Sequence, residues 1–185
     1  MFGVDELKAI LPPPASPCVT SSQMDWIAIF EAIGTRLPGD FIEAYKAYGD
    51  GVFVSRSHPR SAGLWLHAGA REPFHRRAAE HLSSLRLAKE RRAKLVPFPL
   101  YWEPAGLLPW GRATNKLDLC WRVSGELADN WPVIVIRAGT GENETFEMSA
   151  IEFLARVIAK SVSCSLLPTG FPGEKGVEFQ AYHSA

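Results

Sequence analysis

The second half of the chain shows the alternation of apolar and polar residues that is typical of a β-strand with one buried face. Over residues 117–123, leucine, tryptophan and valine occupy every second position, and Asp118, Cys120 and Arg122 lie between them. Residues 132–136 are continuously apolar and mostly β-branched, which indicates a central strand covered on both faces. A polar turn at 139–143 leads to a short strand at 145–147, which we expect to pair back as a hairpin.

Helical spacing of apolar residues marks four other segments. The longest, residues 73–94, has no proline or glycine after Pro73 and carries one apolar stripe. Two shorter helices are predicted before it, at 20–33 and 37–48, and one after it, capped by Ser149. The sequence therefore predicts an α+β fold, in which an antiparallel-rich central sheet packs against two N-terminal helices, a long middle helix and a C-terminal helix. Further strands are expected at 52–54, 63–67, 162–167 and 177–179, and the candidate caps of the first helix are Thr20, Ser21 and Ser22.

The length of 185 residues suits one buried core better than two. Four prolines among residues 12–17 remove backbone donors and favour an extended segment. We therefore expect residues 1–19 to form a loosely attached Pro-rich arm and residues 20–185 to form a single domain.

Charge and cysteine content give no sign of a polyanionic partner or an oxidising compartment. Twenty basic residues balance twenty acidic ones, so any charge effect must be local. Three widely spaced cysteines, Cys18, Cys120 and Cys164, fit neither a disulfide framework nor a zinc cluster, and reduced thiols are expected. Because no apolar stretch approaches a bilayer span, we expect a cytoplasmic protein without a membrane partner.

Two blocks of motifs follow one another in a fixed order over residues 24–160. The first is an amphipathic helix at 26–34, then Leu37-Pro38, Asp40-Phe41 and a turn at 48–51. The second block comprises residues 107–111, Asn115, Asp118, Trp121 and residues 131–135, 146–149 and 152–154. The ordered series resembles the SUKH superfamily, whose members include bacterial immunity proteins against polymorphic toxins and fungal regulators of cell-wall synthesis. One departure is that residues 115–118 stand where the family often has Asn-Gly-Asp.

The resemblance implies an antidote that binds a cognate toxin stoichiometrically, with no cofactor and no catalysis. We hypothesise that partner-binding residues come from the second block and from the long helix. Trp110 is equally compatible with a core or an interface position. A chain of neutral balance favours either a toxin that is not a basic nuclease or a local acidic patch. The hypothesised partner-binding residues are Trp110, Gly111, Asn115, Asp118, Arg76 and Arg77.

Catalytic and metal-binding interpretations are weaker. His75 and His81 share a helix, but a spacing of six residues places them off a common face, so they do not favour a shared metal. Asp118 and Glu147 lie on neighbouring predicted strands and form a candidate acid–base pair. A single buried acid that accepts a hydrogen bond from a loop is the simpler role for Asp118.

The long helix offers an alternative function. Residues 71–94 contain eight Arg or Lys against three Glu, which gives a local excess of five positive charges. A solvated helix face is the simplest interpretation, contact with an acidic protein surface the next, and nucleic-acid binding through helix 73–94 the third. The last is disfavoured because the rest of the chain must carry a balancing negative charge.

Overall fold

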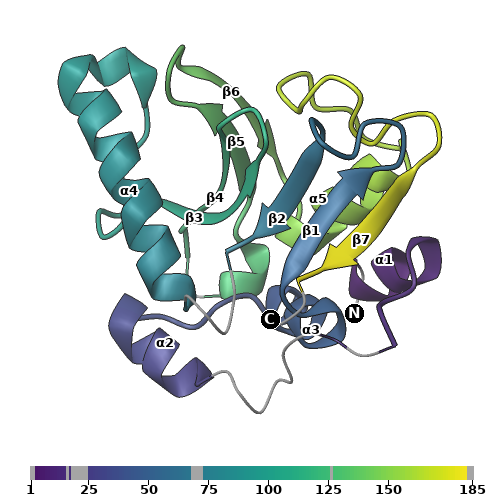
Figure 1. Cartoon of the computed structure of the whole chain (residues 1–185). Coiled ribbons are helices and arrows are strands. Elements are labelled where there is room, and N and C mark those ends of the chain that lie inside the picture. The colour runs from purple at the N-terminus through teal and green to yellow at the C-terminus, as the bar shows by residue number, and fades with distance from the viewer. Residues whose placement is uncertain (1–2, 16, 18–24, 68–72, 126, 183–185) are drawn as a thin grey trace.

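A computed structural model describes residues 3–15, 17, 25–67, 73–125 and 127–182, and within them the chain forms five α-helices and one seven-stranded antiparallel sheet (Figure 1). The predicted α+β class is confirmed. The helices are α1 Val4–Ile10, α2 Trp26–Ile33, α3 Gly39–Tyr48, α4 Phe74–Arg91 and α5 Ala150–Ile158, with short 3-10 helices η2 Ala93–Leu95 and η3 Ala128–Asn130. The strands are β1 Gly51–Ser55, β2 Gly63–Leu66, β3 Leu107–Ala113, β4 Leu117–Arg122, β5 Val133–Arg137, β6 Glu142–Phe146 and β7 Val177–Ala181.

Strands β1 to β6 form a meander, and β7 is added beside β1. The order of the sheet is β6-β5-β4-β3-β2-β1-β7, so strands β1 to β6 each pair with their sequence neighbours, and β7 returns to pair with β1. The predicted hairpin of residues 132–147 is present as β5 and β6. A register shift between Pro109 and Gly111 interrupts the pairing of β3 with β4.

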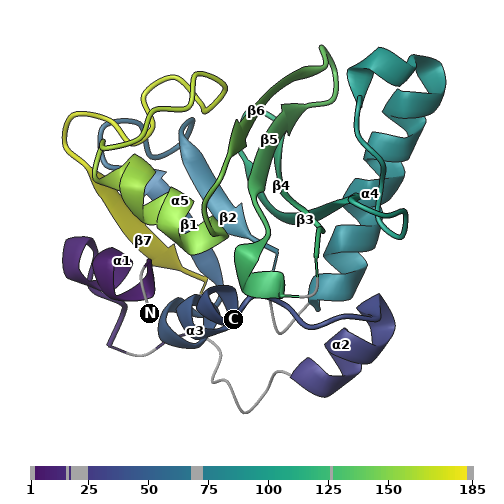
Figure 2. The same ribbon diagram turned by 180° about the vertical axis from the view of Figure 1, so that it is seen from behind.

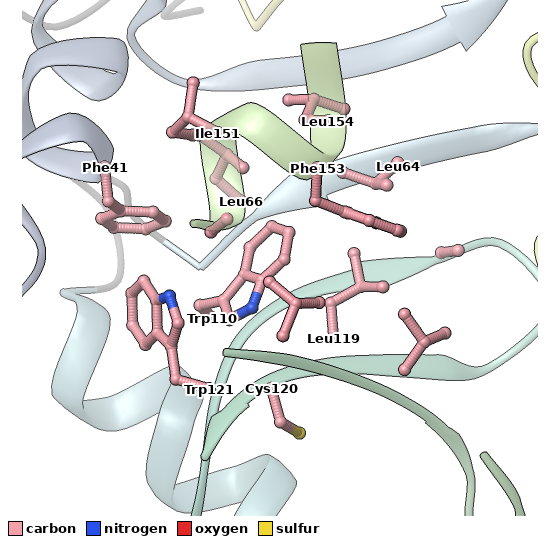
Figure 3. Close-up of a cluster of buried hydrophobic side chains, with 14 of the residues drawn as sticks. Phe41, Leu64, Leu66, Trp110, Leu119, Cys120, Trp121, Ile151, Phe153 and Leu154 are labelled. Carbon is pink, nitrogen blue, oxygen red and sulfur yellow. The ribbon is translucent and has the colours of Figure 1, made fainter. Parts of the chain in front are cut away.

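Helices lie on both faces of this sheet. The two opposite views place α5 on one face, with α1 and α3 beside it, and α4 on the other face near β3 (Figures 1 and 2). On the α5 face, Ile151, Phe153 and Leu154 point at side chains from β2, β3 and β4, whereas Cys120 points away from them (Figure 3). Alternation along β4 therefore turns Asp118 and Cys120 towards α4.

Large aromatic side chains fill the core between sheet and helices. Trp121 is fully buried and has ring centroids of Phe41, Trp110 and Trp131 within 5.0 to 6.0 Å. Their mutual angles range from 35° to 77°, the tilted and edge-to-face arrangements that aromatic pairs prefer. Trp121 therefore joins α3 to strands β3 and β4 and to the segment before β5.

Helix ends are largely where the sequence predicts them. Gly34 ends α2 in the left-handed conformation, at φ 65°, and the Ser149 side chain accepts a hydrogen bond from the Glu152 N–H at the start of α5. Asp25 caps α2. The candidate caps at 20–22 lie outside the described residues.

Two strand predictions are wrong. Residues 107–113, where no strand is predicted, form the central strand β3. Residues 162–167, predicted as a strand, form bends and a turn, and Leu166 and Leu167 within this segment are buried without strand pairing. In both cases tertiary packing outweighs the local pattern.

The prediction of a loosely attached arm is wrong for the first helix. Val4, Leu7 and Leu11 are buried, and α1 packs against α5. The hydroxyl group of Tyr48 in α3 donates a hydrogen bond to the Leu11 carbonyl oxygen at 2.5 Å. Because the apolar stripe of α1 covers the end of the core, this segment is part of the domain.

Candidate functional site

Two of the predicted partner-binding residues lie inside the protein. Trp110 is fully buried, and its ring packs on Trp121 at 6.0 Å. Gly111 is buried in β3, where an added Cβ would lie 2.9 Å from the carbonyl oxygen of Trp65. Neither residue is accessible at the surface of this structure, and of the two positions considered for Trp110 the core is the correct one.

The other four predicted residues do not form one surface. Asp118 is buried beneath α4 and Asn115 donates from Nδ2 to the Leu166 carbonyl oxygen at 2.8 Å. Arg76 is exposed and Arg77 half-buried on α4. The acid–base pair is also wrong, because β5 separates the strand of Asp118 from the strand that precedes Glu147.

Asp118 belongs to a buried polar cluster under α4 that the sequence did not reveal. Its Oδ1 lies 2.6 Å from Nδ1 of His81, and the His81 and His67 rings are tilted by 46° with centroids 4.2 Å apart. His67 is fully buried, and neither of its ring nitrogens makes a hydrogen bond with a described residue. Burial lowers the pKa of His67 well below its usual range, helped by the charges of His81, Arg77 and Arg112, although the nearby Pro109 carbonyl opposes the shift.

We expect His67→Leu to make the stability less sensitive to acid. In the native protein His67 stays neutral, whereas in the unfolded chain it takes up a proton as the pH falls through about 6.5. Stability is therefore lost below that pH, at up to about 1.4 kcal/mol per pH unit for this group. Urea unfolding at pH 7, 6 and 5 should show a shallower loss in the variant.

The exposed His58 provides the control for this experiment. His58→Leu should keep the pH slope of the unmodified protein. Equal slopes for His67→Leu and the unmodified protein would contradict a buried, neutral His67.

A hollow of about 420 Å³ at the start of α5 is the candidate binding site. It lies where the first turn of α3, helix η3 and the connection from β6 to α5 come together. We call it the acidic hollow, because four of its seven lining residues are carboxylates. The lining residues are Asp40, Asp129, Asn130, Glu147, Met148, Ser149 and Glu152.

Asp40 is the most unusual residue of the acidic hollow. Its side chain is only 4% exposed, Oδ2 accepts a hydrogen bond from the Ile151 N–H at 3.3 Å, and Oδ1 has no partner among the described residues. Burial raises the pKa of Asp40 above 3.8, and the charge of Asp129 adds to the shift. Ser149 and the N–H groups of Ile151 and Phe41 oppose it. The carboxylate is therefore buried with one oxygen unused.

The other three carboxylates differ in their partners. Asp129 accepts a hydrogen bond from the Gly39 N–H at 2.5 Å. Glu147 lies 3.7 Å from an Arg122 nitrogen, and Glu152 lies 2.7 Å from an Arg156 nitrogen. Among the described residues, Asp40 and Asp129 make no ion pair, so the acidic hollow presents uncompensated negative charge. A guanidinium or ammonium group is the natural complement of such a site.

This site was missed because its residues are far apart in the sequence. In the sequence Asp40 appears only as part of the Asp40-Phe41 motif, yet its side chain accepts a hydrogen bond from the N-terminus of α5. Glu147 was considered as part of a strand and as an acid–base partner of Asp118, whereas Ser149 carried only a capping signal and Glu152 only its place in the second motif block. The one available sign was that both motif blocks contribute acids, at Asp40 and at Glu147 and Glu152.

We expect Asp40→Asn to stabilise the protein at neutral pH. A carboxyl group with a raised native pKa is penalised when it ionises, so stability falls as the pH rises from about 3.8 through the native pKa. Asparagine keeps the acceptor for Ile151 and removes the charge. The gain at pH 7 should be about 1.4 kcal/mol for each unit by which the pKa is raised, and it should vanish as the pH falls below about 4.

Thermal or urea unfolding across this range measures the effect. Glu147→Gln, which removes the same charge from a side chain that is 74% exposed, should change stability by no more than about 0.5 kcal/mol. A destabilised Asp40→Asn variant at pH 7 would contradict the proposed burial penalty.

Comparison of the chain with protein-family models, with curated proteins and with solved structures finds no match. In the described part of the chain, no group of three or more His, Cys, Asp or Glu side chains is arranged to hold a metal ion. None of the helices described has the length and apolar character needed to cross a bilayer.

Proposed function

We propose that this chain is a protein-binding domain of the SUKH immunity type, which neutralises a toxin by binding it stoichiometrically and takes a basic side chain of that toxin into the acidic hollow. The observation that carries the proposal is the Asp40 carboxylate, which is buried beside Asp129 with one oxygen unpaired.

The energetics of Asp40 favour a binding role. A buried carboxylate without a cation costs stability, and an isosteric amide, which carries no charge, costs less. A partner arginine would supply donors for the unused oxygen and a charge opposite to those of Asp40 and Asp129. Arginine is also enriched among the residues that dominate binding energy at interfaces. The buried carboxylate lowers the stability of the free protein. This cost is offset only when a cation binds.

The positions of the motif residues support the SUKH part of the proposal. Asp40 comes from the first motif block and Glu147, Met148, Ser149 and Glu152 from the last, yet all five line one hollow. The two blocks that define the resemblance therefore supply most of the candidate site. The hollow also provides the local acidic patch that the neutral overall charge left open, so a basic toxin is compatible with this chain.

Gene neighbourhood and a growth assay test the proposal. A gene for a large secreted protein with a toxin-like carboxyl-terminal domain should lie beside the gene for this chain. Producing that domain in bacterial cells should stop growth, and co-producing this chain should restore it. The purified proteins should form a one-to-one complex.

Charge reversal in the acidic hollow links the rescue to the site. Asp129→Lys should weaken the complex at least about tenfold, whereas Glu90→Lys on the exposed surface of α4 should not. A growth-arresting neighbour that this chain neither binds nor neutralises would refute the proposal, as would the absence of such a gene.

The basic helix supports a second candidate function, nucleic-acid binding. Arg76, Arg86 and Arg91 on α4 are exposed, as are Arg92 and Lys94 immediately after it. Lys89 instead donates from Nζ to the Phe98 carbonyl oxygen at 2.6 Å and so helps to hold the following loop. Gel-shift titrations at two salt concentrations separate the candidates, because phosphate binding weakens steeply with salt.

A further inference from the structure

A second hollow, of about 520 Å³, adjoins the acidic one. It lies between the end of α2, the start of α3 and helix η3, and we call it the apolar hollow. Its aliphatic and aromatic lining comprises Phe30, Leu37, Ile42, Leu127 and Ala128. Leu127 is 66% exposed, a large fraction for a leucine that lines a concavity.

Helix η3 and the first turn of α3 contribute to the lining of both hollows. Asp129 lines both, and it accepts a hydrogen bond from the N–H of Gly39, which lines the apolar hollow. The first turn of α3 also contributes to both, through Asp40 on one side and Ile42 on the other. A ligand that fills one hollow therefore meets the other within a short distance of chain.

The chemistry of the two sides is complementary to a mixed peptide. The acidic side offers Asp129 and the unpaired Oδ1 of Asp40 to a cation. The apolar side offers half-buried and exposed hydrophobic side chains, together with Arg36, which suits a backbone carbonyl group of a bound segment. Small polar molecules satisfy only the first side, and aliphatic ones only the second.

We propose that both hollows are filled together by one extended segment of the partner protein, which carries an arginine or lysine within two residues of a bulky apolar residue. This inference rests on the proposed function and specifies its partner. The basic side chain enters the acidic hollow beside Asp40, the apolar side chain packs against Leu127 and Phe30, and the segment crosses Asp129. Charge complementarity selects a basic segment over an acidic one.

Synthetic peptides test the two-hollow arrangement without knowledge of the partner. The probes are capped glycine-rich peptides that carry one arginine and one leucine, adjacent or separated by one or two glycines. The full chain, labelled with nitrogen-15, is titrated with each probe to millimolar concentration by NMR. Peptides with arginine replaced by glutamine, or leucine replaced by glycine, provide the comparison.

At least one probe that carries both arginine and leucine should bind about tenfold more tightly than either of its single-substituted versions. It should shift the amide signals of residues around Asp129 and Leu127 together. Asp129→Asn and Leu127→Ser should each weaken that binding several-fold. Glu90→Gln and Leu87→Ser, matched changes on exposed parts of α4, should leave it unchanged.

The inference is overturned if no probe binds at millimolar concentration. It is also overturned if the probes that carry both arginine and leucine bind no more tightly than the single-substituted ones. The outcome is distinguishable from that of the toxin experiment. A neutralised toxin whose affinity is unaffected by both Asp129→Asn and Leu127→Ser would preserve the proposed function and refute this mode of recognition. Peptide binding by a chain that has no toxin partner would support this mode of recognition and refute the proposed function.

Discussion

Replacing Trp121 with alanine is expected to destabilise the fold by about 3–5 kcal/mol, a large part of the stability of a domain this size. The side chain is fully buried, and its ring contacts Phe41 from α3, Trp110 from β3 and Trp131 before β5. No neighbour is free to fill the cavity, because these residues are themselves buried and packed on one another. Urea unfolding followed by circular dichroism measures the loss.

Two controls accompany Trp121→Ala. Trp102→Ala removes the same side chain from a position that is 65% exposed and should cost no more than about 1 kcal/mol. Trp121→Phe keeps an aromatic ring, so its loss of stability should lie between those of Trp121→Ala and Trp102→Ala. If Trp121→Ala costs no more stability than Trp102→Ala, the aromatic cluster does not hold α3 and the sheet together.

Leu7→Ala in the first helix is expected to cost about 2–5 kcal/mol, as for a residue in the centre of a core. Leu7 is fully buried against the rest of the protein, and α1 packs on α5, the same helix that contributes Ser149 and Glu152 to the acidic hollow. A loosely attached arm would instead tolerate the change without measurable effect. Denaturant unfolding therefore decides between the two descriptions of this segment.

Ile10 provides the matched control, since it lies on the same helix and is 44% exposed. Ile10→Ala should cost no more than about 1 kcal/mol. Similar small effects of both substitutions would indicate that α1 detaches readily from α5 in solution.

The sequence predicted those parts of the fold that depend on local pattern. The period-two residues of β4, the continuous apolar run of β5, the Ser149 cap of α5 and Gly34 at the end of α2 all carry their signals within a few residues. Strand β3 was missed because Pro109 and Gly111 are typical of loops. In the sheet they are accommodated at the register shift, and Gly111 lets the Trp65 backbone approach closely.

The candidate site depends on contacts that no local pattern records. Asp40 and Ile151 are separated by more than a hundred residues, and their hydrogen bond exists only because α3 packs against α5. The same holds for His67, whose ring meets His81 only once α4 lies over β3. In contrast, the sequence left Trp110 equally compatible with a core and an interface position, and its burial follows from the place of its segment in the central strand β3.

Strand β7 pairs with β1, so β1 is synthesised long before its partner on that edge of the sheet. All residues between Ser55 and Val177 must be made before the outer edge of β1 finds its partner, which takes on the order of ten seconds on a ribosome. Phe179 of β7 also closes over Tyr48 and Phe53, at centroid distances of 5.3 and 4.9 Å. Until it arrives, the nascent chain exposes an aromatic strand edge to other chains, and the last strand is what removes this route to aggregation.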